Sequence, residues 1–164
     1  MLYICRKNYK QIKMDTRTET MQPCTIAYMR RTGAYGIECK AVMEQLKLWA
    51  KQTNNLNDDS IVLGIALDNP GETAPDSCRY DACLVVSNDF HTDDTSILTR
   101  ELNGGKYCVF TVVHTTESIQ KAWSTMFTEI STLGYNLDFS RPIIERYAMK
   151  MIRKHLCEIC VPIA

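Results

Sequence analysis

The sequence lacks the features that mark membrane, secreted and nucleic-acid-binding proteins. Its 164 residues contain no apolar run near the roughly 18 residues that a membrane span needs. Arg6, Lys7 and Lys10 interrupt any secretory hydrophobic region after Met1. Neither sign of charge is in excess, because 19 Lys and Arg residues balance 19 Asp and Glu residues. Phosphate contacts need concentrated positive charge, so we expect a cytoplasmic protein without direct nucleic-acid or membrane binding.

Metal-ligand patterns are also scarce. The eight cysteines should be reduced thiols in the cytoplasm. Cys157 and Cys160 have the spacing of zinc ligands, but no second pair completes a tetrahedral site. They also lie in an apolar strand pattern that would turn one cysteine to each side. We therefore expect no metal and no other cofactor.

The N-terminus differs in charge from the rest of the chain. Four basic residues and no acidic residue precede Asp15. Such a segment is typical of a solvated tail, although it also fits the remnant of a linker from an upstream domain. We predict a basic extension over residues 1–17 and one globular domain over residues 18–164, a length that suits a single core.

Hydrophobic periodicity divides the domain into two similar halves. In each half, a strand is followed by an amphipathic helix and then by two more strands. In the first half the predicted strands are Thr25–Arg31, Ser60–Asp68 and Tyr80–Ser87, with a helix from Ile37 to about Ala50. In the second half they are Lys106–His114, Ile143–Met151 and Leu156–Ile163, with a helix over about Glu117–Leu133. A further arm, Ser96–Leu102, precedes the second half.

Two βαββ units of this kind predict an α+β fold with an internal duplication. Their strands should form an antiparallel sheet with both helices on one face. A pseudo-twofold cleft should follow between the halves, and such junctions are common ligand sites.

One strand carries an unexpected carboxylate. Strict alternation puts Ile143, Glu145, Tyr147 and Met149 on one face of the Ile143–Met151 strand, which we predict to be the buried face. An unpaired buried carboxylate costs several kcal/mol or takes up a proton, so it requires a partner or a purpose. One interpretation makes Glu145 a structural residue, satisfied by hydrogen bonds from a tyrosine or by pairing with Arg79 or Arg146. The other makes it part of a site.

Three segments in order identify a family. They are "RRTGAYG" over residues 30–36, "DNPGETAPDSCRYDACLVV" over 68–86, and "RPIIERY" over 141–147. Together they resemble the GyrI-like small-molecule-binding family, which includes the SbmC DNA gyrase inhibitor and the effector-binding domains of Rob-type and BmrR-type transcription regulators. The resemblance covers about Thr18 to Ala164. The chain is most similar to the SbmC branch, with which it shares Trp123 and the absence of a Gly-Pro-aromatic turn before the second helix.

The resemblance implies a non-catalytic binding module for amphipathic, cationic or aromatic small molecules. It carries Glu145 into the ligand pocket. Aromatic faces beside a carboxylate attract a delocalised cation, worth about 0.5–2 kcal/mol for the cation–π contact. The candidate ligand-binding residues are Glu145, Tyr147, Tyr35, Trp123 and Phe110. The output would be effector sensing, sequestration of a toxic compound or gyrase modulation, with DNA gyrase or an upstream DNA-binding domain as the protein partner.

Two alternatives remain open at this point. Some GyrI-like proteins hydrolyse strained electrophilic natural products, and here Glu145 could be the general base with Tyr147 or Tyr35 as a proton donor. The middle motif also has an architectural interpretation, which we favour. Asp68 suits a turn, whereas Arg79 and Asp81 share a strand face and could pair with each other or with turn groups.

Overall fold

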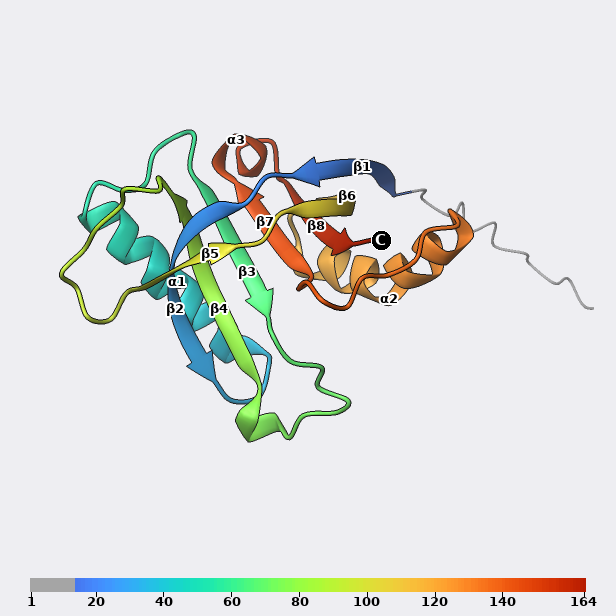
Figure 1. The fold of residues 1–164 in the computed structure, drawn as a ribbon, viewed down its shortest axis with the longest axis horizontal. Helices are drawn as coiled ribbons and strands as arrows, with labels where there is room; N and C mark the ends of the chain where they lie inside the picture. Colours follow the sequence, from blue (N-terminus) through green and yellow to red (C-terminus); the bar gives the residue numbers. More distant parts are fainter. Residues whose placement is uncertain (1–13) are drawn as a thin grey trace, which may run out of the picture.

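The structure is a computed structural model and describes residues 14–164 (Figure 1). The predicted basic extension lies largely outside these residues. The strands are β1 (Asp15–Met21), β2 (Cys24–Thr32), β3 (Ile61–Ala66), β4 (Arg79–Val86), β5 (Leu98–Leu102), β6 (Gly105–Val113), β7 (Ile144–Ala148) and β8 (Leu156–Pro162). The helices are α1 (Ile37–Gln52), the 3₁₀ turn η1 (Pro75–Ser77), α2 (Thr116–Thr132) and α3 (Met149–Ile152).

The described strands form one antiparallel sheet in the order β1-β6-β8-β7-β3-β4-β2-β5. β1, β2, β3 and β4 of the first half correspond to β5, β6, β7 and β8 of the second half. Corresponding strands occur in the same order from either edge of the sheet, so a pseudo-twofold axis passes between β7 and β3. The α+β prediction with duplicated units is confirmed. The edge strands are exchanged between halves, because β1 pairs with β6 and β5 pairs with β2.

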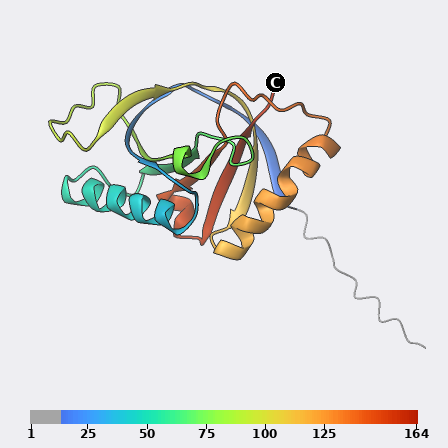
Figure 2. The same cartoon turned by 90° about the horizontal axis from the view of Figure 1, so that it is seen from below.

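Both long helices cover the same face of the sheet (Figure 2). Leu46 and Trp49 of α1 pack on β2, β3 and β4, whereas Met126 and Ile130 of α2 pack on β6 and β8. Tyr147 of β7 contacts both clusters, at the junction between the halves. We call this the helix face. Neither α1, α2 nor any shorter helix within residues 14–164 is long and apolar enough to cross a membrane.

The termini of α2 follow from its sequence. The Thr115 side chain accepts a hydrogen bond from the Ser118 backbone N–H at 3.2 Å and so caps the first turn. Gly134 follows the last turn with φ of +79°, the left-handed conformation expected of a glycine after a helix end. These two local signals fix the length of the helix that reaches the junction.

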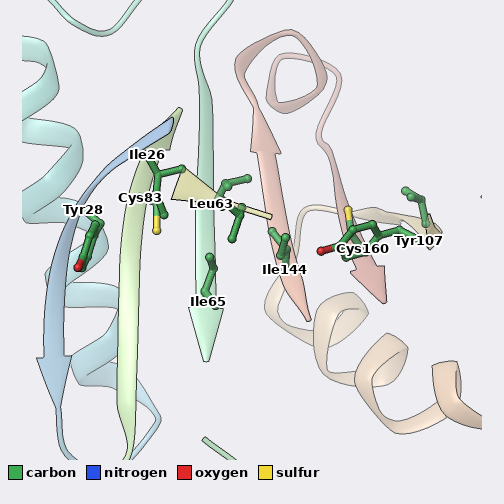
Figure 3. Packing of buried hydrophobic residues seen from close by; sticks show 10 residues of the cluster. Ile26, Tyr28, Leu63, Ile65, Cys83, Tyr107, Ile144 and Cys160 are labelled. Carbon is green, nitrogen blue, oxygen red and sulfur yellow. The ribbon is translucent and has the colours of Figure 1, made fainter. Parts of the chain in front are cut away.

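Neither α1 nor α2 lies on the opposite face of the sheet, which we call the inner face (Figure 2). Ile26, Leu63, Ile65 and Ile144 form part of its apolar cluster, which spans strands of both halves (Figure 3). The sheet curls so that the β1–β2 link (residues 22–23) and the β5–β6 link (residues 103–104) lie side by side, with Met21 opposite Gly105 before them and Cys24 opposite Leu102 after them. A Cβ at Gly104 would lie only 2.3 Å from the carbonyl oxygen of Met21, the last residue of β1, so the two segments are in close backbone contact.

The structure differs from the sequence predictions at both ends. Residues 15–17, assigned above to the extension, belong to β1, which pairs with β6 over its whole length. β7 ends at Ala148, where α3 begins, so the predicted strand to Met151 is too long. The predicted alternation along β7 is correct, but side chains are buried or half-buried on both of its faces. Ile144, on the face predicted to be less buried, is only 1% exposed.

Two buried carboxylates anchor the exchanged edge strands. Asp81 of β4 is fully buried and accepts from Arg30 Nε at 2.7 Å and from Arg100 Nη2 of β5 at 3.0 Å. Glu158 of β8 is 3% exposed and accepts from Arg146 of β7 and from Arg17 of β1. Each half thus buries one carboxylate on the inner face and uses it to hold an arginine from an edge strand.

Candidate functional site

The junction strands β3 and β7 place Glu145 on the helix face. β7 pairs antiparallel with β3 so that Glu145 lies opposite Gly64, and Tyr147 lies opposite Val62. Glu145 and Tyr147 project to the same side because they are two residues apart on a strand. That side is the one where α1 and α2 pack.

The Glu145 carboxylate has only neutral partners among the described residues. Tyr147 Oη donates a hydrogen bond to Glu145 Oε2, and the Trp123 side chain on α2 also hydrogen-bonds it. Burial raises the pKa of Glu145, and the hydrogen bonds from Tyr147 and Trp123 only partly oppose this shift. No ion pair to Glu145 occurs within residues 14–164. Its negative charge is therefore weakly solvated and unneutralised.

Three further side chains join this cluster and were missed from the sequence. The Tyr80 hydroxyl lies over Gly64, where an added Cβ would be 2.4 Å from it, and Met43 of α1 approaches the same point. The pKa of the Tyr80 phenol is raised by burial and then by the charge of Glu145. His114, which follows β6, has its ring 5.5 Å from that of Tyr147.

His114 extends the cluster toward α1. Its backbone N–H donates to the His155 carbonyl at 2.8 Å, which fixes the start of the loop before α2. Burial lowers the pKa of His114, and the positive charge of Lys47 on α1 lowers it further. The imidazole is therefore biased toward its neutral form. The cluster has one acid and a surround of aromatic and neutral groups.

The structure places the other two predicted site residues differently. Tyr35 Oη accepts from the Asp68 N–H at 3.0 Å and donates to the Arg79 carbonyl at 2.8 Å, so it stabilises a turn away from the carboxylate. Phe110 is fully buried in the hydrophobic cluster that also includes Trp123 and Tyr147. Ile159 of β8 pairs with both Phe110 and Glu145, so Phe110 lies two strands from the carboxylate on the same face.

The arginines proposed as structural partners of Glu145 have other partners. Arg79 binds Asp68 at 2.8 Å, and Arg146 binds Glu19 and Glu158, each at 2.9 Å. Arg79 and Asp81 do not pair with each other, because Asp81 is held by Arg30 and Arg100. These contacts agree with the architectural interpretation of the middle motif. Arg79 pairs with the turn residue Asp68 of the same motif, whereas Asp81 is held by Arg30 and Arg100 from outside it.

A cavity of about 340 Å³ lies on the other side of the sheet. It opens on the inner face, and Glu145 is not among its lining residues. The lining includes Ile61 and Leu63 of β3, Ile144 and Arg146 of β7, and Leu102 of β5. Sequence patterns gave no sign of this cavity.

The chain is similar to known proteins both in sequence and in fold. The family model described as "GyrI-like small molecule binding domain" matches residues 14–164. The SPbeta prophage-derived putative transcriptional regulator YosT of Bacillus subtilis (strain 168) is 40% identical over 151 residues, covering 92% of this chain and 99% of YosT. DNA gyrase inhibitor 1 of Dickeya dadantii (strain 3937) is 30% identical over 81 residues, covering 48% of this chain and 53% of that protein.

Solved structures with lower identity share the fold. EcmrR in its DNA complex superposes with a TM-score of 0.69 at 14% identity, covering 92% of this chain and 57% of EcmrR. SAV2435 bound to tetraphenylphosphonium gives 0.57 at 16% identity, covering 92% of this chain and 94% of that one. A hydrolase from Listeria innocua gives 0.60 at 11% identity, covering 93% of each chain.

Proposed function

This chain belongs to the family of GyrI-like small molecule binding domains, and we propose that it binds amphipathic aromatic cations at Glu145. The observation that supports this proposal most directly is the state of that carboxylate. Glu145 is half-buried, has aromatic neighbours and lacks a cationic partner among the described residues. A cation brought against it would gain a desolvated charge partner and aromatic faces at once.

Each residue around Glu145 would have its own role in binding. Tyr147 and Trp123 orient the carboxylate through hydrogen bonds and offer ring surface beside it. Tyr80, with its hydroxyl over Gly64, lines the same point from β4. SAV2435, which shares the fold, was solved with the lipophilic cation tetraphenylphosphonium, and this supports the choice of an aromatic cation as ligand.

We propose effector sensing, sequestration or gyrase modulation as the output of binding. The relatives named transcriptional regulator and gyrase inhibitor support a role of this kind.

Glu145→Gln tests the ligand site, because the amide preserves volume and removes only the charge. We expect the affinity for tetraphenylphosphonium to fall by about 1–3 kcal/mol, tenfold or more, when measured by isothermal titration calorimetry. The melting temperature should hold or rise, since a poorly solvated charge is removed. A neutral analogue of similar shape should lose little affinity.

Phe127→Leu is a matched control, because Phe127 is an exposed aromatic of the same helix as Trp123. It should leave the affinity for the cation unchanged. If a folded Glu145→Gln variant binds the cation with wild-type affinity, the assignment of Glu145 to the ligand site is refuted.

A second candidate function is hydrolysis of a strained electrophile. The contact between Tyr147 Oη and Glu145 supports it, because a desolvated carboxylate could act as general base on a water with the phenol nearby. Tyr35 is no longer needed in this scheme, since its hydroxyl is bound to backbone. Consumption of an electrophilic ligand by the wild type, absent in Glu145→Gln, would place this function first. Binding without turnover would count against it.

A further inference from the structure

The inner-face cavity is enclosed by parts of both halves. Its floor consists of aliphatic side chains from the central strands, Ile61, Leu63, Val85 and Ile144. Its wall is formed by the two adjacent links and the strand ends beside them, which contribute residues Met21, Gln22, Cys24, Leu102 and Asn103. At about 340 Å³ it lies at the lower end of the roughly 300–1,000 Å³ typical of ligand pockets.

The two links are held tightly against each other. Gly104 approaches so closely that an added Cβ would meet the Met21 oxygen at 2.3 Å and the Pro23 nitrogen at 2.8 Å. The ion pairs of Arg17 with Glu158 and of Arg100 with Asp81 hold the edge strands from which the links begin. The wall of the cavity is therefore built by the fold and does not depend on a ligand.

The charges beside the cavity are neutralised within the protein. Two charged residues line it, Glu19 and Arg146, and they form a two-bonded ion pair with both distances at 2.9 Å. Arg146 also donates to Glu158 at 3.0 Å. Neither a cationic nor an anionic ligand would find an unpaired charge there. The Cys24 thiol stays uncharged too, because burial raises its pKa.

We propose that this cavity is a second ligand site, for a neutral and mainly apolar small molecule. Apolar contact with the aliphatic floor supplies the attraction. The exposed amides of Gln22 and Asn103 are within the lining and serve one polar group of the ligand at the rim. The chemistry differs from that at Glu145, where one unneutralised carboxylate favours a cation.

The sheet itself separates the two sites. Leu63 and Ile144 line the cavity, whereas their chain neighbours Gly64 and Glu145 point to the helix face. Successive residues of a strand project to opposite faces, so the two ligands would occupy opposite sides of the same pair of strands. Both should bind at the same time.

Two probes distinguish the sites on the full chain. N-phenyl-1-naphthylamine is a neutral probe that fluoresces when it enters an apolar site, and tetraphenylphosphonium is the cation. Val85→Trp fills the cavity, because Val85 is a half-buried lining residue. This variant should lower the affinity for the neutral probe by about tenfold or more and change the affinity for the cation by less than about twofold. Val113→Trp, at an exposed valine outside the lining, is the matched control and should change neither.

The reciprocal variant completes the test. Glu145→Gln should weaken the cation and leave the neutral probe unchanged, and saturating cation should not displace the neutral probe. If Val85→Trp lowers the folded fraction by circular dichroism, the smaller change Ile61→Phe, at a lining residue on the neighbouring strand β3, carries the same test. The proposal is overturned if the neutral probe fails to bind, if it binds both cavity variants with wild-type affinity, or if the cation displaces it competitively. If the wild type does not bind the cation, the Glu145 proposal alone is refuted.

Discussion

Asp81→Asn should unfold the protein more easily without touching either ligand site. Asp81 is fully buried, and its two oxygens accept three hydrogen bonds from two arginines, at 2.7, 2.9 and 3.0 Å. Asparagine keeps the shape but supplies one acceptor oxygen and no charge. Its amide N–H groups would then face guanidinium groups that can only donate.

The magnitude follows from the burial of each partner. Removing one partner of a buried ion pair costs about 3–5 kcal/mol. Arg30 and Arg100 keep 31% and 29% of their side chains exposed, so both can turn partly to water. We therefore expect the lower end, about 3 kcal/mol of unfolding free energy. For a domain of this size that is a fall in melting temperature of about 6–12 °C.

Thermal and urea unfolding followed by circular dichroism measure this loss. Asp59→Asn is the matched control, since Asp59 pairs with Lys150 on the surface and should leave the melting temperature unchanged. In a double-mutant cycle, Arg100→Met should cost much less in the Asp81→Asn background than in the wild type. A variant as stable as the wild type that has lost tetraphenylphosphonium binding would refute the architectural role of Asp81.

Two further predictions concern the ligand sites. Gly104→Ala should lower the unfolding free energy by about 1–3 kcal/mol and weaken binding of the neutral probe, because the new Cβ would push the Met21 backbone and open the wall of the cavity. Gly71→Ala, in an exposed turn, is the control and should change neither quantity. Stability measurements and probe titrations check this, and a tolerated alanine at position 104 would contradict the close backbone contact of the links. Cation binding should strengthen as pH rises through the pKa of Glu145, which is raised above the ordinary glutamate value of about 4.3. The contribution of Glu145 to folding stability is fully present below the ordinary value and is lost as pH rises through the raised pKa. Cation affinity should therefore rise with pH while the melting temperature falls, and a pH-independent affinity would contradict the role of this carboxylate.

The sequence predicted the elements that have a clear apolar period. The stripe of α2 and the apolar runs of β3, β4 and β8 are strong enough to be recognised without tertiary contacts. β1 was missed because "DTRTETM" has no apolar stripe, and only its pairing with β6 makes it a strand. Its polar residues suit an edge strand whose arginine and glutamate reach the buried Glu158 and Arg146. Such a strand is specified by its partners rather than by its own pattern.

The proposed sites show the same limit. Glu145 could be selected because a carboxylate is conspicuous in an apolar strand, and Tyr147 followed from the alternation. Tyr80 and Gly64 carried only weak signals, a tyrosine within the middle motif and a glycine inside an apolar run. It is the register of β3 between β4 and β7 that places both against Glu145. The inner cavity had no local signal, because its wall depends on two links that lie far apart in the chain and come together only when the sheet curls. Strand alternation thus gives one pair of strands two chemically different faces, and the long-range pairing of the links decides which face holds a cavity.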